Sequence, residues 1–307
     1  MKHAYVFPGQ GAQAVGMGKD LYDNVPAAKE LFEKANEILG FRITDIMFAG
    51  TDEELKQTKV TQPAVFLHSV IMAKALGVKP DAAAGHSLGE FSALVVAGAL
   101  SFEDGLKLVS KRAMAMQAAC EAQPGTMAAI LGLEDKVVEE ICASVDGVVV
   151  AANYNCPGQL VIGGEKAAVD KAAALAKEAG ARRCIPLKVS GPFHTRLMAP
   201  AGDALAKRFA SESFGEMQVP VLFNCLGREK AEQDSIPALL VKQVQSSVYM
   251  EDTLHRLGEL GVDHILEVGP GSALAGFVKK TLPGVVCASV ETPEQLNAAL
   301  TAWKEEL

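Results

Sequence analysis

Short apolar runs alternate with amphipathic segments along most of the chain. The runs predict buried strands at residues 4–7, 82–84, 219–224 and 264–268. Residues with a helical period predict helices at 27–39, 61–76, 90–98, 101–119, 236–245 and 273–280, and a further helix from Arg196. Strands that are separated by helices of this length indicate an α/β fold with a mainly parallel sheet covered on both faces.

The order of the elements changes between residues 125 and 189. There the pattern predicts strands at 126–131, 148–152, 160–163 and 182–187, helices at 134–144 and 165–179, and a turn at 153–158. This β-α-β-β-α-β order is that of the ferredoxin-like split βαβ unit. We therefore expect a ferredoxin-like subdomain at residues 125–189, inserted into a larger domain formed by residues 1–124 and 190–307.

The composition is that of a folded globular protein, with 49% hydrophobic and 21% charged residues over 307 positions. The longest apolar run, residues 93–100, is too short to span a bilayer, so no membrane segment is expected. The first residues lack the apolar core of a secretory signal, and the six scattered cysteines form no C-x-x-C pair. These features predict a cytoplasmic protein with reduced thiols and no zinc ribbon.

The charge is unevenly distributed. The net charge of −8 disfavours nucleic acid as the main partner. Residues 165–196 depart from this balance, because they contain seven lysines or arginines and three acidic residues. This basic stretch is interpreted either as a solvated helix face or as a docking surface for an acidic partner.

The stretch Gly85-His86-Ser87-Leu88-Gly89 fits the G-x-S-x-G pattern of a nucleophile elbow. In this motif a strand turns sharply into a helix and exposes a serine, and glycines are needed where the backbones crowd each other. A predicted strand precedes the motif and a predicted helix follows it, as the elbow requires. The alternative is a glycine-rich turn that carries a surface serine.

A serine nucleophile needs a base, because its hydroxyl is almost un-ionised at neutral pH. His86 adjoins Ser87, but neighbouring side chains on an elbow point in different directions, so we do not expect them to pair. His68 is expected to be packed on its helix. His194 lies downstream of the serine on a loop after a strand, which is the chain order of α/β-hydrolases.

Two further features bear on ligands. Residues 9–14 formally match the dinucleotide fingerprint G-x-G-x-x-A, but Gly16 and Gly18 follow where that motif requires a helix. We therefore interpret this loop as a source of backbone N–H groups for an anion. Arg112 falls near the middle of the apolar face of helix 101–119, so it either pairs with an internal carboxylate, which we favour on pattern alone, or receives an anionic ligand.

Five motifs occur together in one order along the whole chain: Phe7-Pro8-Gly9-Gln10-Gly11, Thr61-Gln62-Pro63-Ala64, Gly85-His86-Ser87-Leu88-Gly89-Glu90, Gly191-Pro192-Phe193-His194 and Glu267-Val268-Gly269-Pro270-Gly271. In this combination the chain closely resembles the malonyl-CoA:acyl-carrier-protein transacylases of fatty acid synthesis. The resemblance implies an α/β-hydrolase-like core with a small ferredoxin-like insert. It further implies that Ser87 is acylated and that His194 is its base.

The resemblance also implies roles for other residues. The backbone N–H groups of Leu88 and Gln10 correspond to the oxyanion hole, and the main-chain carbonyl of Gln243 corresponds to the group that orients the histidine. Arg112 matches the arginine that binds the free carboxylate of malonyl, which reverses the preference for an internal ion pair.

Two pocket residues follow from the same resemblance. Phe193 is similar to the residue of malonyl-selective members, and its bulk is expected to crowd a 2-methyl group. Asn155 is expected to help line the pocket.

The activity implied is ping-pong acyl transfer from malonyl-CoA to the phosphopantetheine thiol of acyl carrier protein, with no cofactor. The carrier is expected to dock near Lys166, Arg182 and Arg183, and the enzyme is expected to be a monomer. An α/β-hydrolase esterase or thioesterase, a catalytically inactive docking module and an acyltransferase of a polyketide pathway are the alternatives. The esterase alternative predicts a functional acid between Ser87 and His194 and no role for Arg112.

Overall fold

The computed structural model describes residues 1–189 and 191–306. Ser190, the first residue of the predicted return to the larger domain, and Leu307 lie outside the described residues. The chain divides into two compact units: the first contains Met1–Ala113, Phe214–Leu222 and the residues from Arg256 onward, and the second contains Met114–Ser213 and Phe223–His255. The second unit therefore includes the whole of the predicted insert, 125–189, together with flanking segments.

The first unit is built on a parallel sheet, as predicted. Its strands occur in the order β11-β10-β1-β2-β7, and each neighbouring pair is parallel. Their bounds are β1 (His3–Phe7), β2 (Ala82–Gly85), β7 (Val221–Phe223), β10 (His264–Val268) and β11 (Val286–Val290). Residues Ala4 to Phe7 of the central β1 are completely buried, which explains the continuous apolar run in the sequence.

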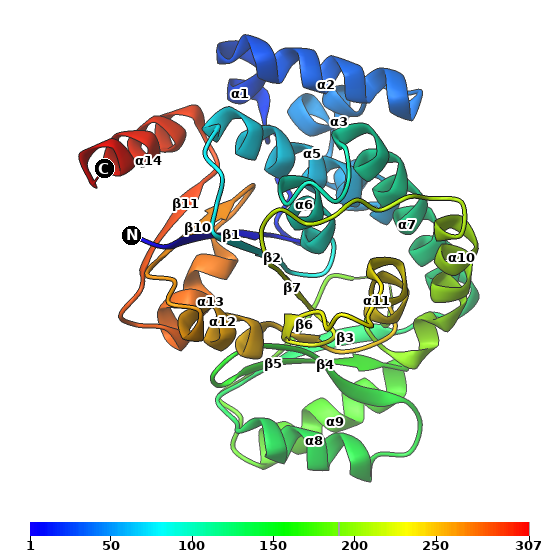
Figure 1. Cartoon of the computed structure of the whole chain (residues 1–307). Helices are drawn as coiled ribbons and strands as arrows, with labels where there is room; N and C mark the ends of the chain where they lie inside the picture. Colours follow the sequence, from blue (N-terminus) through cyan, green and yellow to red (C-terminus); the bar gives the residue numbers. More distant parts are fainter. Residues whose placement is uncertain (190, 307) are drawn as a thin grey trace. The chain divides into compact units, whose positions relative to one another are not determined.

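Helices cover both faces of this sheet. Helices α5 and α6 pack on one face, and α13 packs on the other (Figure 1). The topology explains this arrangement. The connection from β1 to β2 and the connection from β10 to β11 run in opposite directions across the sheet. Because both crossovers are right-handed, their helices are expected on opposite faces. No helix in the described part of the chain is long and apolar enough to cross a membrane. The helices that begin in this unit are α1 (Lys19–Asn24), α2 (Pro26–Leu39), α3 (Ile43–Ala49), α4 (Asp52–Lys56), α5 (Thr58–Leu76), α6 (Gly89–Val96), α7 (Phe102–Ala122), α13 (Ala273–Thr281) and α14 (Pro293–Glu306).

The second unit contains a separate sheet with the strand order β6-β3-β5-β4-β9. The pairs β3/β5, β3/β6 and β4/β5 are antiparallel, and β4/β9 is parallel. The elements are β3 (Thr126–Leu131), α8 (Asp135–Ser144), β4 (Val149–Cys156), β5 (Gln159–Gly164), α9 (Lys166–Glu178), β6 (Arg183–Pro186), the 3₁₀ helix η1 (Arg196–Met198), α10 (Ala199–Phe209), β8 (Arg228–Glu229), α11 (Ile236–Gln243), β9 (Val248–Tyr249) and α12 (Met250–Glu259).

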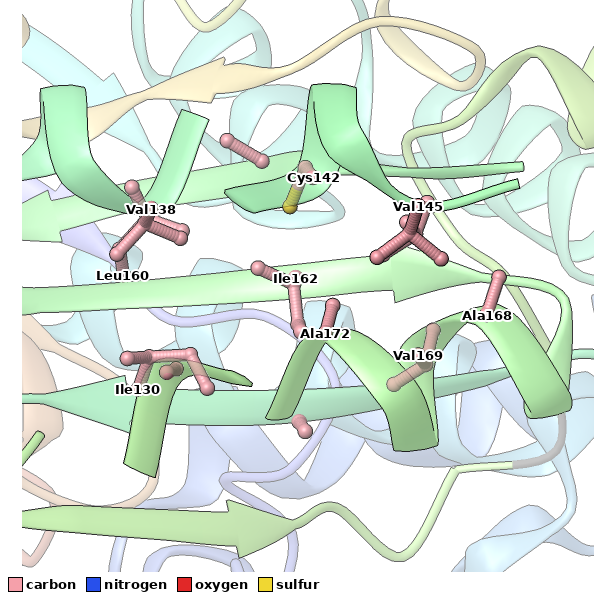
Figure 2. Packing of buried hydrophobic residues seen from close by; sticks show 13 residues of the cluster. Ile130, Val138, Cys142, Val145, Leu160, Ile162, Ala168, Val169 and Ala172 are labelled. Atoms are coloured by element: carbon pink, nitrogen blue, oxygen red, sulfur yellow. The ribbon is translucent and has the colours of Figure 1, made fainter. Parts of the chain in front are cut away.

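Helices α8 and α9 share one hydrophobic core with this sheet (Figure 2). Ile130, Leu160 and Ile162 project from β3 and β5 toward the helices. The facing residues of α9 include Ala168, Ala172 and Ala176, whose small size lets the helix lie close to the strands. The helix predicted at 165–179 is therefore a packed element of this unit.

Two sequence-based boundaries were wrong. Helix α5 begins at Thr58 rather than Thr61, so Pro63 lies inside the helix and not in its first turn. Strand β4 continues to Cys156, where a turn over 153–158 was predicted. The pairing of β4 with β5 and β9 extends the strand through Asn153 and Tyr154, and such non-local pairing leaves no mark in the local pattern.

Candidate active site

Ser87 lies on a sharp turn between β2 and α6. Its φ is 53°, and among the residues that the structure describes only Ser87 and His194 are non-glycine residues with a positive φ. A Cβ at Gly85 would lie 1.9 Å from the carbonyl carbon of Gly89, and a Cβ at Gly89 would lie 2.1 Å from the Phe7 oxygen. Both glycines are thus required by close backbone contact, and the turn has the geometry predicted for the elbow.

The loop after β1 passes beside this turn. A Cβ at Gly9 would lie 2.5 Å from the His86 oxygen and 3.6 Å from the Ser87 Cβ. The next residue, Gln10, donates its side-chain amide to Thr58 Oγ1 at 3.2 Å. No helix begins directly after this loop, since α1 starts only at Lys19, so the dinucleotide interpretation is rightly excluded.

Arg112 is completely buried on α7, and its guanidinium points toward Ser87. Nη1 donates to Gln62 Oε1 at 2.7 Å, and Nη2 donates to Ser87 Oγ at 3.1 Å. The guanidinium also lies over the Phe91 ring, 5.7 Å from its centroid. An arginine 25 positions from Ser87 in the chain therefore contacts the serine hydroxyl directly.

Arg112 keeps its positive charge in this buried position. Burial lowers the pKa of Arg112 to about 10, and the nearby carboxylate of Glu90 acts in the opposite direction. Glu90 is itself completely buried on α6. Because a pKa near 10 still lies well above neutral pH, the guanidinium remains a cation.

In the second unit, His194 is held by a backbone carbonyl. Its Nδ1 donates to the Gln243 oxygen at 2.9 Å, and since a carbonyl can only accept, the proton of the neutral ring resides on Nδ1. Nε2 then carries the lone pair that a general base needs. Gln243 is the last residue of α11, where carbonyls have no partner within the helix, and its amide donates to Asn224 Oδ1 at 3.4 Å.

The loop around His194 is tightly packed. His194 has φ 60°, a conformation that persists only when its surroundings impose it. Thr195 Oγ1 donates to the Pro192 oxygen at 2.7 Å and accepts from the Leu197 N–H at 3.3 Å. A Cβ at Gly191 would lie 2.0 Å from Cys120 Sγ, so only glycine fits there.

The two predicted pocket residues also lie in the second unit. Phe193 is 6% exposed and directly precedes the histidine. Asn155 is likewise nearly buried, on β4 rather than on the turn where the sequence pattern had placed it.

The structure thus groups the predicted site residues into two sets. In the first unit it brings Ser87 to Arg112, and the backbone of the Gly9 loop to the Ser87 turn. In the second unit it brings His194 to Gln243. Among the described residues, no cluster of histidine, cysteine, aspartate or glutamate is arranged to hold a metal ion.

Sequence reasoning assigned no role to three residues that support these groups: Gln62, Thr195 and Asn224. Gln62 is part of the Thr61-Gln62-Pro63 motif, which was the available signal. Nothing local identifies Asn224.

The residues predicted to bind a carrier protein differ in their surroundings. Lys166 forms an exposed ion pair with Asp170 at 2.7 Å within α9. Arg182 and Arg183 are exposed and, within the described residues, are not paired with a carboxylate. Together with Lys177 they line a surface hollow of about 380 Å³ beside strand β6.

Known proteins resemble the chain over nearly its whole length. Residues 4–297 match the family described as "Acyl transferase domain". A malonyl CoA-acyl carrier protein transacylase of Bacillus subtilis (strain 168) is 43% identical over 99% of this chain and 98% of that relative.

Solved structures agree with this match. The transacylase of Clostridium perfringens is 40% identical, with a TM-score of 0.95 over the whole of this chain and 98% of that one. A malonyl-transacylase in complex with a type II PKS acyl-carrier protein is 38% identical, with a TM-score of 0.95 over 98% of this chain and 100% of that one.

Proposed function

This chain belongs to the acyl transferase domain family, and we propose that it transfers the malonyl group from malonyl-CoA to the phosphopantetheine thiol of acyl carrier protein. The observation that carries the substrate assignment is the buried guanidinium of Arg112, 3.1 Å from the hydroxyl of Ser87. In a malonyl thioester, one methylene separates the carboxylate from the reacting carbonyl. A cation that binds this carboxylate must therefore lie beside the nucleophile, as Arg112 does.

In the first half-reaction Ser87 Oγ attacks the thioester carbonyl, and His194 Nε2 accepts the hydroxyl proton. The negative charge that develops on the carbonyl oxygen is stabilised by the N–H groups of Leu88 and Gln10, at about 3 kcal/mol for each donor. The C–S bond then breaks, CoA leaves as the thiol with the proton from His194, and malonyl remains as an ester of Ser87. The Gln243 carbonyl keeps the imidazole in the tautomer that this step needs, so no aspartate is assigned to that role.

In the second half-reaction the phosphopantetheine thiol of the carrier gives its proton to His194 and attacks the malonyl ester. Ser87 leaves and recovers the proton, which completes a ping-pong cycle. CoA and phosphopantetheine act as acyl-carrying substrates, and we propose that no resident cofactor takes part.

Arg112 accounts for the selectivity. An acetyl group would occupy the site without supplying an anion for the guanidinium, at a cost on the order of 3–5 kcal/mol relative to malonyl. The planar fork of arginine suits a carboxylate, and lysine should not replace it. Phe193 is proposed to exclude 2-methyl substituents, and Asn155 to line the acyl pocket.

Carrier docking is proposed at the basic hollow beside β6. Arg182 and Arg183 are exposed there without a carboxylate partner among the described residues, so they are available to an acidic protein. Lys166 already has Asp170 as a partner and should contribute less. Reversing Arg182 and Arg183 to glutamate should raise the KM for the carrier about tenfold at low salt and leave malonyl loading of Ser87 unchanged. Lys166→Glu is the matched control, and equal effects of the two changes would contradict this surface.

The finer architecture belongs to the same proposal. Residues 125–189 are proposed to form a ferredoxin-like subdomain, supported by the order β6-β3-β5-β4 and by both helices packing on one core. Residues 1–124 and 190–307 are proposed to form an α/β-hydrolase-like domain. A monomeric state and a cytoplasmic location also remain predictions.

A polyketide pathway is the second candidate role. It is favoured by one observation, the similarity to a malonyl-transacylase whose carrier partner is a type II PKS protein.

The experiment that tests the substrate assignment compares the transfer of several acyl groups from their CoA thioesters by wild type and by Arg112→Ala. We expect malonyl transfer to fall by at least about 100-fold in the variant, because a charge-assisted bidentate contact is lost. Retained malonyl transfer would contradict the assignment, and the same assay with several carrier proteins separates the two pathways.

A further inference from the structure

Arg112 forms a hydrogen bond directly to the proposed nucleophile. Its Nη2 donates to Ser87 Oγ at 3.1 Å, and its Nη1 donates to Gln62 Oε1 at 2.7 Å. All three groups lie in the first unit, and both Arg112 and Gln62 are essentially buried. The guanidinium that is assigned to the malonyl carboxylate is therefore hydrogen-bonded to the oxygen that must attack the thioester.

Such a contact has a chemical consequence. A hydrogen bond from a cation engages a lone pair of Ser87 Oγ and lowers the reactivity of that oxygen as a nucleophile. A carboxylate is a stronger acceptor than a neutral hydroxyl, and it takes two parallel N–H groups of a guanidinium at once. The substrate carboxylate therefore competes with Ser87 for the same group.

We propose that Arg112 masks Ser87 until a substrate carboxylate draws the guanidinium away, so that malonyl-CoA unmasks the nucleophile that will attack it. This proposal rests on the proposed function. It adds a second source of selectivity, because an acyl-CoA without a carboxylate leaves Arg112 on Ser87.

Gln62 is the positioning residue of this device. Its amide oxygen holds one end of the guanidinium while the other end reaches Ser87. Replacing the amide by a carboxylate of the same shape should pull Arg112 toward position 62 and away from the serine. Gln62→Glu should therefore imitate the unmasked state without substrate.

The test is the rate at which Ser87 reacts with phenylmethylsulfonyl fluoride, a small neutral reagent, followed by intact mass spectrometry of the full-length protein. Arg112→Met should react about tenfold faster than wild type, which is the order of factor that a hydrogen bond to a charged group represents. Gln62→Glu, which is nearly isosteric, should also react faster, by about fivefold. Lys111→Met, which removes an exposed cation one position away on α7, should react like wild type.

An opposite electrostatic effect makes the test decisive. If the charge of Arg112 instead activated Ser87 by stabilising its alkoxide, Arg112→Met and Gln62→Glu would react more slowly than wild type. Slower or unchanged rates in both variants overturn the masking. Loading of wild-type Ser87 from malonyl-CoA is measured in parallel. If Ser87 is loaded but the variants are not labelled faster by the reagent, only the masking proposal fails. If Ser87 is not loaded, the proposed function fails.

Discussion

Replacing Gly191 by alanine should disturb the candidate base through a single atom. The new Cβ would lie 2.0 Å from Cys120 Sγ and 3.0 Å from Cys120 Cβ, where unstrained carbon contacts are about 3.5–4.0 Å. Cys120 is 5% exposed on α7, so its thiol has little room to rotate away. The strain falls on a loop that reaches His194 three residues later.

The magnitude follows from these contacts. Overpacking of this kind costs about 1–3 kcal/mol of unfolding free energy. Cys120→Ala alone should cost about 1 kcal/mol, because it removes one buried sulfur. The double variant Gly191→Ala/Cys120→Ala removes the closest contact and leaves those of 3.0 Å to Cys120 Cβ and 3.4 Å to Phe193 Cε1, so it should be more stable than Gly191→Ala alone.

The assay is a double-mutant cycle read by urea unfolding and by kcat for malonyl transfer. We expect rescue of at least about 1 kcal/mol, together with recovery of kcat as the Nδ1 contact of His194 is restored. If the two substitutions proved additive in stability and activity, the packing of Cys120 against Gly191 would not control this loop.

Two further predictions concern other buried groups. Thr195→Val keeps the shape of the side chain but removes the hydroxyl that bonds the Pro192 carbonyl and the Leu197 N–H. We expect the free energy of unfolding to fall by about 1–3 kcal/mol and kcat to fall with little change in KM. Thr195→Ser should retain most of the activity. Burial raises the pKa of Glu267 from 4.5 to about 7, although the carboxylate accepts two backbone N–H groups at the start of α13. Between these two pKa values the folded state binds a proton on Glu267 that the unfolded state does not. The contribution of this group to the free energy of unfolding, about 3 kcal/mol, is therefore complete below pH 4.5 and is lost as the pH rises to about 7. Glu267→Gln should remove that slope from urea unfolding measured across this pH range, and an unchanged slope would assign it to other groups.

The sequence predicted the parts of the site that depend on local sterics. The elbow was predictable because Gly85 and Gly89 are required wherever a strand turns into a helix at this spacing, and their backbone contacts confirm it. Arg112 was conspicuous because a permanent cation on an apolar helix face needs an acceptor. The parallel sheet followed from fully apolar runs such as that of β1.

The parts that depend on distant partners could not be predicted. Gln62 is an ordinary polar residue until α5 places it 2.7 Å from a guanidinium 50 positions away in the chain. The continuation of α5 through Pro63 likewise depends on tertiary packing, because proline within a helix removes a backbone hydrogen bond.

The central claim is that Ser87 carries malonyl between two thiols, and one measurement tests it most directly. Wild-type protein is mixed with malonyl-CoA, and its mass and the position of the adduct are determined before and after holo acyl carrier protein is added. We predict one malonyl group on Ser87, no adduct in Ser87→Ala, and transfer of the group from the protein to the carrier thiol. An adduct on another residue, or release of free malonate in place of transfer to the carrier, would contradict the account.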